Sequence, residues 1–159
     1  MKYTSFAVLD FETGGFNAQI NPITQVAVVM IDGKTLEKKV VYSNYVKPYD
    51  NTLVYEQAAL DYCHITMSML IDKGVELEKI VKDLCVIFSN ILSCNDKKYR
   101  SLLVGQNITF DIPFLVDIFN RCNEYLSKYF KNTFDDKNFK KGDRFYGLFY
   151  PQHLDTLNL

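Results

Sequence analysis

Short apolar runs open this sequence and constrain its fold more than any other feature. Residues 6–9 form a continuous apolar run of the kind found in a strand covered on both faces. Residues 23–31 are rich in β-branched side chains and end at an Asp-Gly pair, which is a hairpin signal. Residues 39–46 then return as a strand that ends before Pro48. The first half of the chain therefore predicts three strands, of which at least two are antiparallel neighbours.

Helical periodicity follows these strands. Thr66 has the side chain of a helix N-cap. Apolar residues recur at three-four spacing through residues 75–92, which predicts one long helix with a single buried face. Residues 102–104 predict another short buried strand. A helix is then expected from about residue 112 to residue 129, with Pro113 in its first turn.

The last thirty residues lose this periodicity and then recover it. Residues 131–147 are rich in Lys, Asp, Asn and Gly and predict a long loop, whereas residues 153–159 predict a final strand. Strands followed by helices, and then strand, helix and strand, indicate an α/β fold with a mixed sheet. At 159 residues, the chain is expected to be a single domain over residues 1–159, with a core of its own.

Composition narrows the class of protein. The chain is 48% hydrophobic and 23% charged, as is ordinary for a globular protein, and its net charge of −1 gives no global attraction to nucleic acid. Any contact with nucleic acid therefore needs a local patch or a bound metal. The apolar run near the N-terminus is too short for a signal peptide, and no segment is long enough to span a bilayer. We expect a cytoplasmic protein with no membrane partner.

The four cysteines form no Cys-x-x-Cys pair and sit among apolar residues. This pattern favours reduced thiols in the core over zinc ligands or disulfides. The positions concerned are Cys63, Cys85, Cys94 and Cys122.

Two carboxylates stand one residue apart at the end of the first apolar run, Asp10 and Glu12. Residues i and i+2 of an extended segment point to the same side, so both side chains can reach one spot. Two like charges at one place are unfavourable unless a proton or a cation lies between them, and oxygen ligands without nearby His or Cys favour Mg²⁺ or Mn²⁺. Alternatively, Asp10 is a turn residue and Glu12 is a solvated surface acid.

A third acid, Asp111, follows the strand predicted at residues 102–104 and opens the next helix. Asp111 or Thr109 can simply cap that helix. However, the ends of neighbouring strands in an α/β sheet are where sites assemble, and three acids at two strand ends suit a two-metal phosphoryl-transfer site.

Four segments in this order resemble one family. The stretch DFETGG at residues 10–15 resembles the first motif of the DEDD superfamily, the DnaQ-like 3′–5′ exonucleases, a group that includes the epsilon subunit of bacterial DNA polymerase III and ribonuclease T. NITFDIPFL at residues 107–115 resembles the second motif. ALDYCHITMSML at residues 59–70 resembles the segment ahead of the long helix, and HLDTLNL at residues 153–159 the strand after the second motif. The resemblance spans essentially the whole chain.

The resemblance implies a ribonuclease H-like domain with a five-stranded mixed sheet flanked by helices. It implies that Asp10 bridges two metal ions, Mg²⁺ or Mn²⁺, that Glu12 holds one of them and that Asp111 serves the other. The backbone of two residues after the acids would approach the terminal nucleotide, and three further side chains would line its pocket. Phe110 is alternatively a core wedge, and His64 a residue at a helix entry. These expected substrate-binding residues are Thr13, Gly14, His64, Asn107 and Phe110.

The third motif of that family is missing from these residues. The family has a fourth carboxylate on a helix, with a general-base His five residues before it or a Tyr four residues before it. Asp155 does not fit, because His153 stands two residues before it and Pro151 four. We expect Asp155 to support the sheet end or the metal shell from outside. Either the chain lacks the last helices of a longer exonuclease, which we favour, or it is a short homologue whose uncovered sheet face takes a partner or a second copy.

The resulting function hypothesis is a metal-dependent 3′–5′ exonuclease acting on single-stranded ends, with DNA favoured over RNA and replication as the expected setting. A DNA polymerase subunit or a second copy of the chain is a candidate partner. The basic residues of the segment 128–144 can follow a phosphate backbone, but its acids dilute that charge, which favours a solvated loop. The alternative function is a non-catalytic nucleic-acid-binding or scaffold module that keeps the exonuclease fold.

Overall fold

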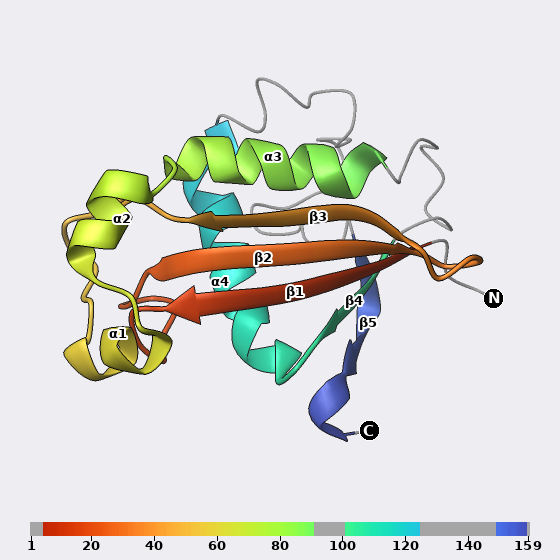
Figure 1. The fold of residues 1–159 in the computed structure, drawn as a ribbon, viewed down its shortest axis with the longest axis horizontal. Coiled ribbons are helices and arrows are strands. Elements are labelled where there is room, and N and C mark those ends of the chain that lie inside the picture. The colour runs from red at the N-terminus through yellow and green to blue at the C-terminus, as the bar shows by residue number, and fades with distance from the viewer. Residues whose placement is uncertain (1–4, 91–100, 125–148, 159) are drawn as a thin grey trace.

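The computed structural model describes residues 5–90, 101–124 and 149–158. Within these ranges a five-stranded sheet has the order β3-β2-β1-β4-β5 (Figure 1). The first three strands pair antiparallel, whereas β4 is parallel to both β1 and β5, so the sheet is mixed as expected. The strands are β1 (Ser5–Thr13), β2 (Ile23–Asp32), β3 (Lys38–Tyr45), β4 (Ser101–Gly105) and β5 (Phe149–Asp155).

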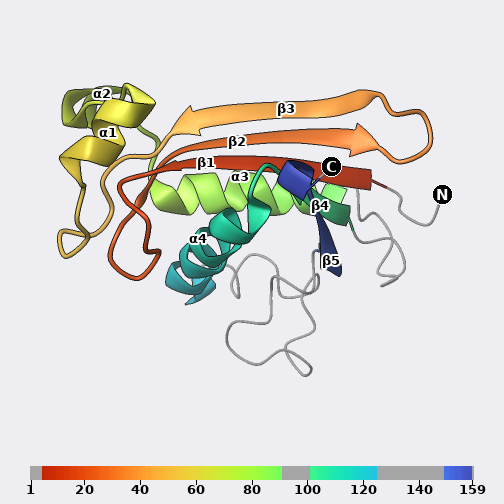
Figure 2. The same cartoon turned by 90° about the horizontal axis from the view of Figure 1, so that it is seen from below.

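Four α-helices are described, of which the two long ones lie on the same side of strands β1–β3 (Figure 2). The two short ones lie at one end of the sheet, close to where β1 ends (Figure 1). No helix in the described part of the chain is long and apolar enough to cross a membrane. The helices are α1 (Gln57–Cys63), α2 (Met67–Lys73), α3 (Leu77–Asn90) and α4 (Ile108–Arg121), and a 3-10 turn, η2 (Thr156–Asn158), follows β5.

Strand β1 shows a clear alternation of burial. Its odd-numbered residues, such as Ala7 and Leu9, are buried in the core, whereas the even-numbered ones are half-buried or exposed. The expectation of a strand fully covered on both faces is therefore wrong, because α3 and α4 cover one face only (Figure 2). This alternation places Asp10 and Glu12 together on the less covered face.

Helix α3 has the single buried face that its periodicity predicts. Ile80, Leu84 and Phe88 on that face are fully buried, and the Phe88 ring meets Phe149 of β5 edge-on at 4.8 Å between centroids. The side chain of Thr66 accepts a hydrogen bond from the Met69 N–H, which confirms its role as the N-cap of α2.

Helix α4 starts at Ile108, four residues before its predicted beginning. Pro113 consequently lies inside the helix and not in its first turn. The N–H that proline lacks would have bonded the Thr109 carbonyl, and Thr109 is exposed, so water can satisfy that oxygen. The helix ends at Arg121, and the rest of its predicted length, from residue 125, lies outside the described residues together with the 131–147 loop.

The last strand also differs from its prediction. β5 begins at Phe149 and ends at Asp155, where the chain turns into η2, so the strand expected over residues 153–159 is only partly right. The Asp155 carboxylate explains the end of the strand. It accepts hydrogen bonds from the N–H groups of Leu157, at 3.0 Å, and Asn107, at 2.9 Å. Asp155 thus ties η2 to the entry of α4, which is the sheet-end role expected for it.

Candidate active site

The end of β1 holds two of the predicted acids inside a regular strand. Asp10 pairs with Ala27 of β2 and Glu12 pairs with Gln25, so Asp10 is not a turn residue. Asp10 is exposed and Glu12 is partly exposed on the same face of the sheet. Burial of the carboxyl, and then the negative charge of Glu12, raise the pKa of Asp10. The two acids are thus close enough to repel each other, as the sequence predicts.

Asp111 is the buried member of the set, with a side chain that is only 3% exposed. It lies in the first turn of α4, and its Oδ1 accepts a hydrogen bond from the Phe11 N–H at 3.0 Å. The register of β4 against β1 stops at Val8, so the β1 backbone beyond that point needs another partner. Asp111 supplies it, and this contact places its carboxylate beside the residue between Asp10 and Glu12.

The N-terminus of α4 is not capped in the way that the simpler reading of Asp111 predicts. Its N-cap is Asn107, in a left-handed conformation with φ 54°, and the Asn107 side chain makes no capping hydrogen bond. Asp111 is turned toward β1 instead. The pKa of Asp111 is raised to about 7, with burial as the largest cause and the negative charges of Asp10 and Glu12 as further causes.

The three acids have the donor chemistry of a site for a hard divalent cation. Carboxylate oxygens are the ligands that Mg²⁺ and Mn²⁺ prefer. Burial first, and then repulsion between the acids, raise the pKa of Asp10 and of Asp111, and a cation would offset both effects. In the described residues, however, no group of three or more acidic, His or Cys side chains is already arranged as ligands of one ion. The donor set fits such an ion, and the side chains would have to close around it.

The segment after Glu12 is fixed mainly by contacts within the protein. The Thr13 hydroxyl donates to the Gly15 carbonyl at 2.7 Å. The Gly14 N–H donates to the Pro22 carbonyl, and the Gly14 carbonyl accepts from the Glu56 N–H. Gly15 is required here because a Cβ would lie 2.4 Å from the side chain of Asn21. The expected approach of Thr13 and Gly14 to a nucleotide stays a prediction.

The other predicted substrate-binding residues surround the same end of the sheet. Asn107 is exposed at the start of α4, and Phe110 is half-buried one turn along. His64 is exposed and ends α1 in a left-handed conformation with φ 56°, so it stands at a helix exit and not at a helix entry. No contact in the described residues tests the part of these three side chains in binding a substrate.

Two residues near the acids were not predicted as site residues. Phe16 is 84% exposed, and its ring meets Phe110 edge-on at 6.2 Å between centroids. Cys63 is partly exposed and donates its thiol hydrogen to Glu12 Oε2 at 2.7 Å, so the expectation of a core thiol is wrong there. The expectation does hold for Cys85 and Cys122, which are buried. The sequence offered one signal for each residue. Phe16 directly follows the Gly-Gly pair, and Cys63 lies in the segment that resembles the family.

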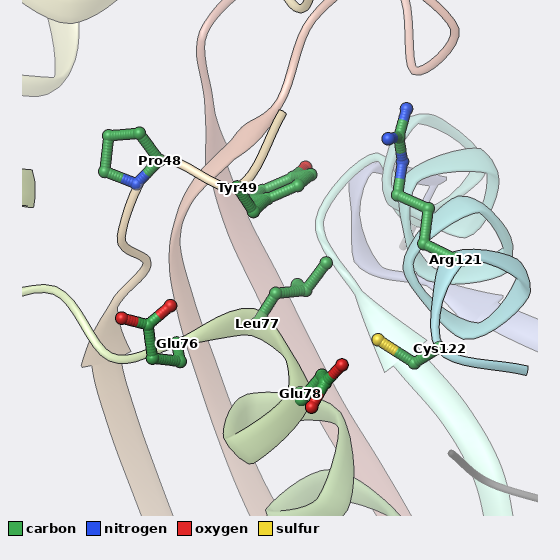
Figure 3. A pocket seen from close by; sticks show the side chains of 7 residues that line it. All are labelled: Pro48, Tyr49, Glu76, Leu77, Glu78, Arg121 and Cys122. Atoms are coloured by element: carbon green, nitrogen blue, oxygen red, sulfur yellow. The ribbon is translucent and has the colours of Figure 1, made fainter. Parts of the chain in front are cut away.

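A cavity of about 650 Å³ lies elsewhere, between the start of α3 and the end of α4 (Figure 3). Tyr49 and Arg121 stand on one side of it, with the guanidinium carbon 5.6 Å from the centre of the tyrosine ring. The Arg121 guanidinium is already bound by Asp117 and Asp50, at 2.7 and 2.6 Å. This cavity is lined by Pro48, Tyr49, Glu76, Leu77, Glu78, Arg121 and Cys122, none of them a predicted site residue.

A family model described as Exonuclease, of the RNase T type, matches residues 7–149 and thus includes all three acids. The chain belongs to the exonuclease family. This membership agrees with the resemblance drawn from the motifs and with the mixed sheet. It does not single out the polymerase epsilon subunit among the family's members.

Solved structures support the same fold for this exonuclease-family chain. Exonuclease I of E. coli in complex with a dT13 oligonucleotide superposes with a TM-score of 0.61 at 22% identity, over 74% of this chain. A product-bound structure of exonuclease I gives a TM-score of 0.62 at 21% identity, over 75% of this chain. The chain spans only 24% and 26% of the length of those two proteins. At these identities the likeness establishes the fold.

Proposed function

We propose that this protein is a metal-dependent 3′–5′ exonuclease that hydrolyses phosphodiester bonds at single-stranded nucleic-acid ends. The observation that carries the proposal is the hydrogen bond from the Phe11 N–H to Asp111, which brings a buried carboxylate from α4 against β1 beside Asp10 and Glu12. Such a set of acids is unfavourable by itself and is suited to holding cations. Membership of the exonuclease family makes the phosphodiester bond of a nucleic acid the expected target of that chemistry.

Each acid would have a separate part in the reaction. Bound Mg²⁺ or Mn²⁺, two ions in the mechanism we propose, supplies charge neutralisation at the scissile phosphate and activates water. Asp10, the most exposed of the three, would face both the ions and the phosphate. Glu12 would hold one ion from the same strand. Asp111, held against the backbone of β1, would serve the other ion from α4.

The aromatic pair next to the acids supports a single-stranded substrate. The Phe16 ring is almost fully exposed and is held edge-on by Phe110, which in turn contacts Phe114 with 5.3 Å between centroids. An exposed ring supported in this way can stack on an unpaired base, which a paired duplex end would not present. Exonuclease I has been solved with dT13 and dA16 oligonucleotides. By analogy, we favour DNA over RNA as the substrate of this protein.

A fourth carboxylate and a general base are still needed. Asp155 does not serve as the fourth acid in this proposal, because its Oδ1 already accepts two backbone N–H groups at the start of α4 and in η2. We expect those groups to come from a third motif outside residues 1–159, from a second copy, or from a partner such as a polymerase subunit. A form without them would be the non-catalytic binding module.

Degradation of a 5′-labelled single-stranded DNA oligonucleotide with Mn²⁺ tests the proposal. The parent protein, supplied with the fourth carboxylate and the general base, should shorten the strand from its 3′ end, and Asp10→Ala should lower the rate by about a hundredfold or more. Phe16→Ala should keep the Mn²⁺ dependence and weaken binding of the strand by about tenfold, since base stacking contributes about 1–3 kcal/mol. Mn²⁺-dependent binding of the oligonucleotide without any cleavage, even when the fourth carboxylate and the general base are supplied, would overturn the exonuclease proposal and favour the binding module.

A further inference from the structure

The regular pairing of β1 with β2 is interrupted next to Glu12, one of the proposed metal ligands. The pairing of β1 with β2 shifts between Glu12 and Thr13, which marks a bulge or irregularity at that step. A bulge re-aims the side chain next to it, and the cross-strand neighbour then no longer fixes that side chain. Glu12 is also only partly buried, so packing holds it weakly. A separate contact is needed to set the direction of its carboxylate.

Cys63 makes that contact. Its Sγ donates to Glu12 Oε2 at 2.7 Å, across 51 residues of sequence. The thiol also interacts with the backbone amide of Thr13, on the other side of the register shift. Cys63 is the last residue of α1, and α1 packs against β1 at the end of the sheet. The thiol therefore joins the helix to both residues between which the strand becomes irregular.

The position of the thiol is itself well determined. His64, which follows it, caps α1 in a left-handed conformation, and its backbone N–H bonds back to the carbonyls of Asp61 and Leu60. Leu60 and Ile65 are buried in a small core with Leu70 of α2. A side chain held at a fixed helix end can orient a carboxylate that the strand leaves loose.

We propose that Cys63 is a positioning residue for the metal site, which orients Glu12 by hydrogen-bonding Oε2 and leaves Oε1 for the ion. This inference rests on the proposed function, because Glu12 is a metal ligand only if that function holds. A neutral donor behind a ligating carboxylate is the arrangement that fixes such ligands in metal sites generally, and its removal typically costs about 10- to 100-fold in metal affinity. Cys63 does not contact the ion or the substrate.

Mn²⁺ binding to single and double variants tests the positioning role. Cys63→Ala should weaken binding of Mn²⁺ about tenfold, and Cys63→Ser, which keeps a donor, should restore it to within about threefold of the parent. In a Glu12→Ala background, adding Cys63→Ala should change the affinity no further, because the thiol acts through Glu12. An equal loss in both backgrounds, or parent-like binding by Cys63→Ala, would overturn the proposal. Cys122→Ala, which removes a buried thiol remote from the acids, is the matched control.

A second measurement needs no metal and separates this inference from the proposed function. The infrared S–H stretching band of Cys63 can be isolated by subtracting the spectrum of Cys63→Ser from that of the parent. Glu12→Ala should move this band to higher wavenumber, because the thiol loses its acceptor. A band that does not move would refute the Cys63–Glu12 contact. If the band moves but the parent binds no Mn²⁺, the contact stands, whereas the positioning role and the proposed metal site both fail.

Discussion

The two ends of helix α4 hold acids in opposite electrostatic settings. At its C-terminal end, Arg121 binds Asp117 and Asp50, and hydrogen bonds from Thr52 and then from Arg121 lower the pKa of Asp50 to about 2. At its N-terminal end, burial and then the charges of Asp10 and Glu12 raise the pKa of Asp111 to about 7. The first cluster supplies its own cation. The second cluster, Asp10, Glu12 and Asp111, contains no positive charge of its own. This lack is the physical argument for a metal ion there.

Replacing the buried acid should have the largest effect on this contrast. Without metal, the folded-state pKa of Asp111 of about 7 exceeds its ordinary value of 3.8. The folded state therefore binds more protons than the unfolded state between about pH 4 and pH 7, and the free energy of unfolding falls as the pH rises through that window. Asp111→Asn, which keeps an oxygen for the Phe11 N–H, should abolish this fall.

The expected gain for Asp111→Asn in metal-free buffer is on the order of 4 kcal/mol at pH 8 and close to zero at pH 4. Urea unfolding at several pH values measures it. With saturating Mn²⁺ the order should reverse, because only the parent would gain stability from the ion. A variant that is less stable than the parent at pH 8 without metal would show that Asp111 is not in a repulsive setting.

Breaking the self-neutralised cluster should have a smaller effect, confined to stability. Arg121→Ala removes both ion pairs and the contact with the Tyr49 ring, and we expect the melting temperature to fall by about 5 °C. The response of the protein to Mn²⁺ should stay that of the parent, because Arg121 is not near the acids of β1. Arg121→Lys should fall between the two, since one ammonium cannot replace a planar group that binds two carboxylates. A lost Mn²⁺ response in Arg121→Ala would contradict the separation of the two regions.

Part of the fold and of the candidate site can be predicted from the sequence, because it depends on local rules. The alternation of a strand is enough to place Asp10 and Glu12 on one face, and three-four periodicity is enough to find the buried face of α3. The bounds of α4 were harder to predict, because Pro113 is typical of a first turn and yet lies inside the helix. Asp155 was expected to support either the end of the sheet or the metal shell; its two backbone contacts agree with the first role, and the second stays a prediction.

The contacts that complete the site could not be predicted, because they join residues far apart in the chain. Phe11 and Asp111 are 100 residues apart, and Cys63 and Glu12 are 51 apart. Neither contact follows a repeat or a propensity. Both depend on where a helix docks against an irregular strand end, which tertiary packing decides. Phe16 was missed for a simpler reason: it follows no strand or helix periodicity, so the sequence does not show that its ring is exposed.

The most direct test of the account is the melting temperature of the parent and of Asp10→Ala as Mn²⁺ is titrated at pH 6 and at pH 8. The melting temperature of the parent should rise with Mn²⁺, and more at pH 8, where Asp111 is ionised without having to release a proton. Asp10→Ala should show little or no rise at either pH. A parent that does not respond to Mn²⁺, or a variant that responds as the parent does, would contradict a metal site at the end of β1.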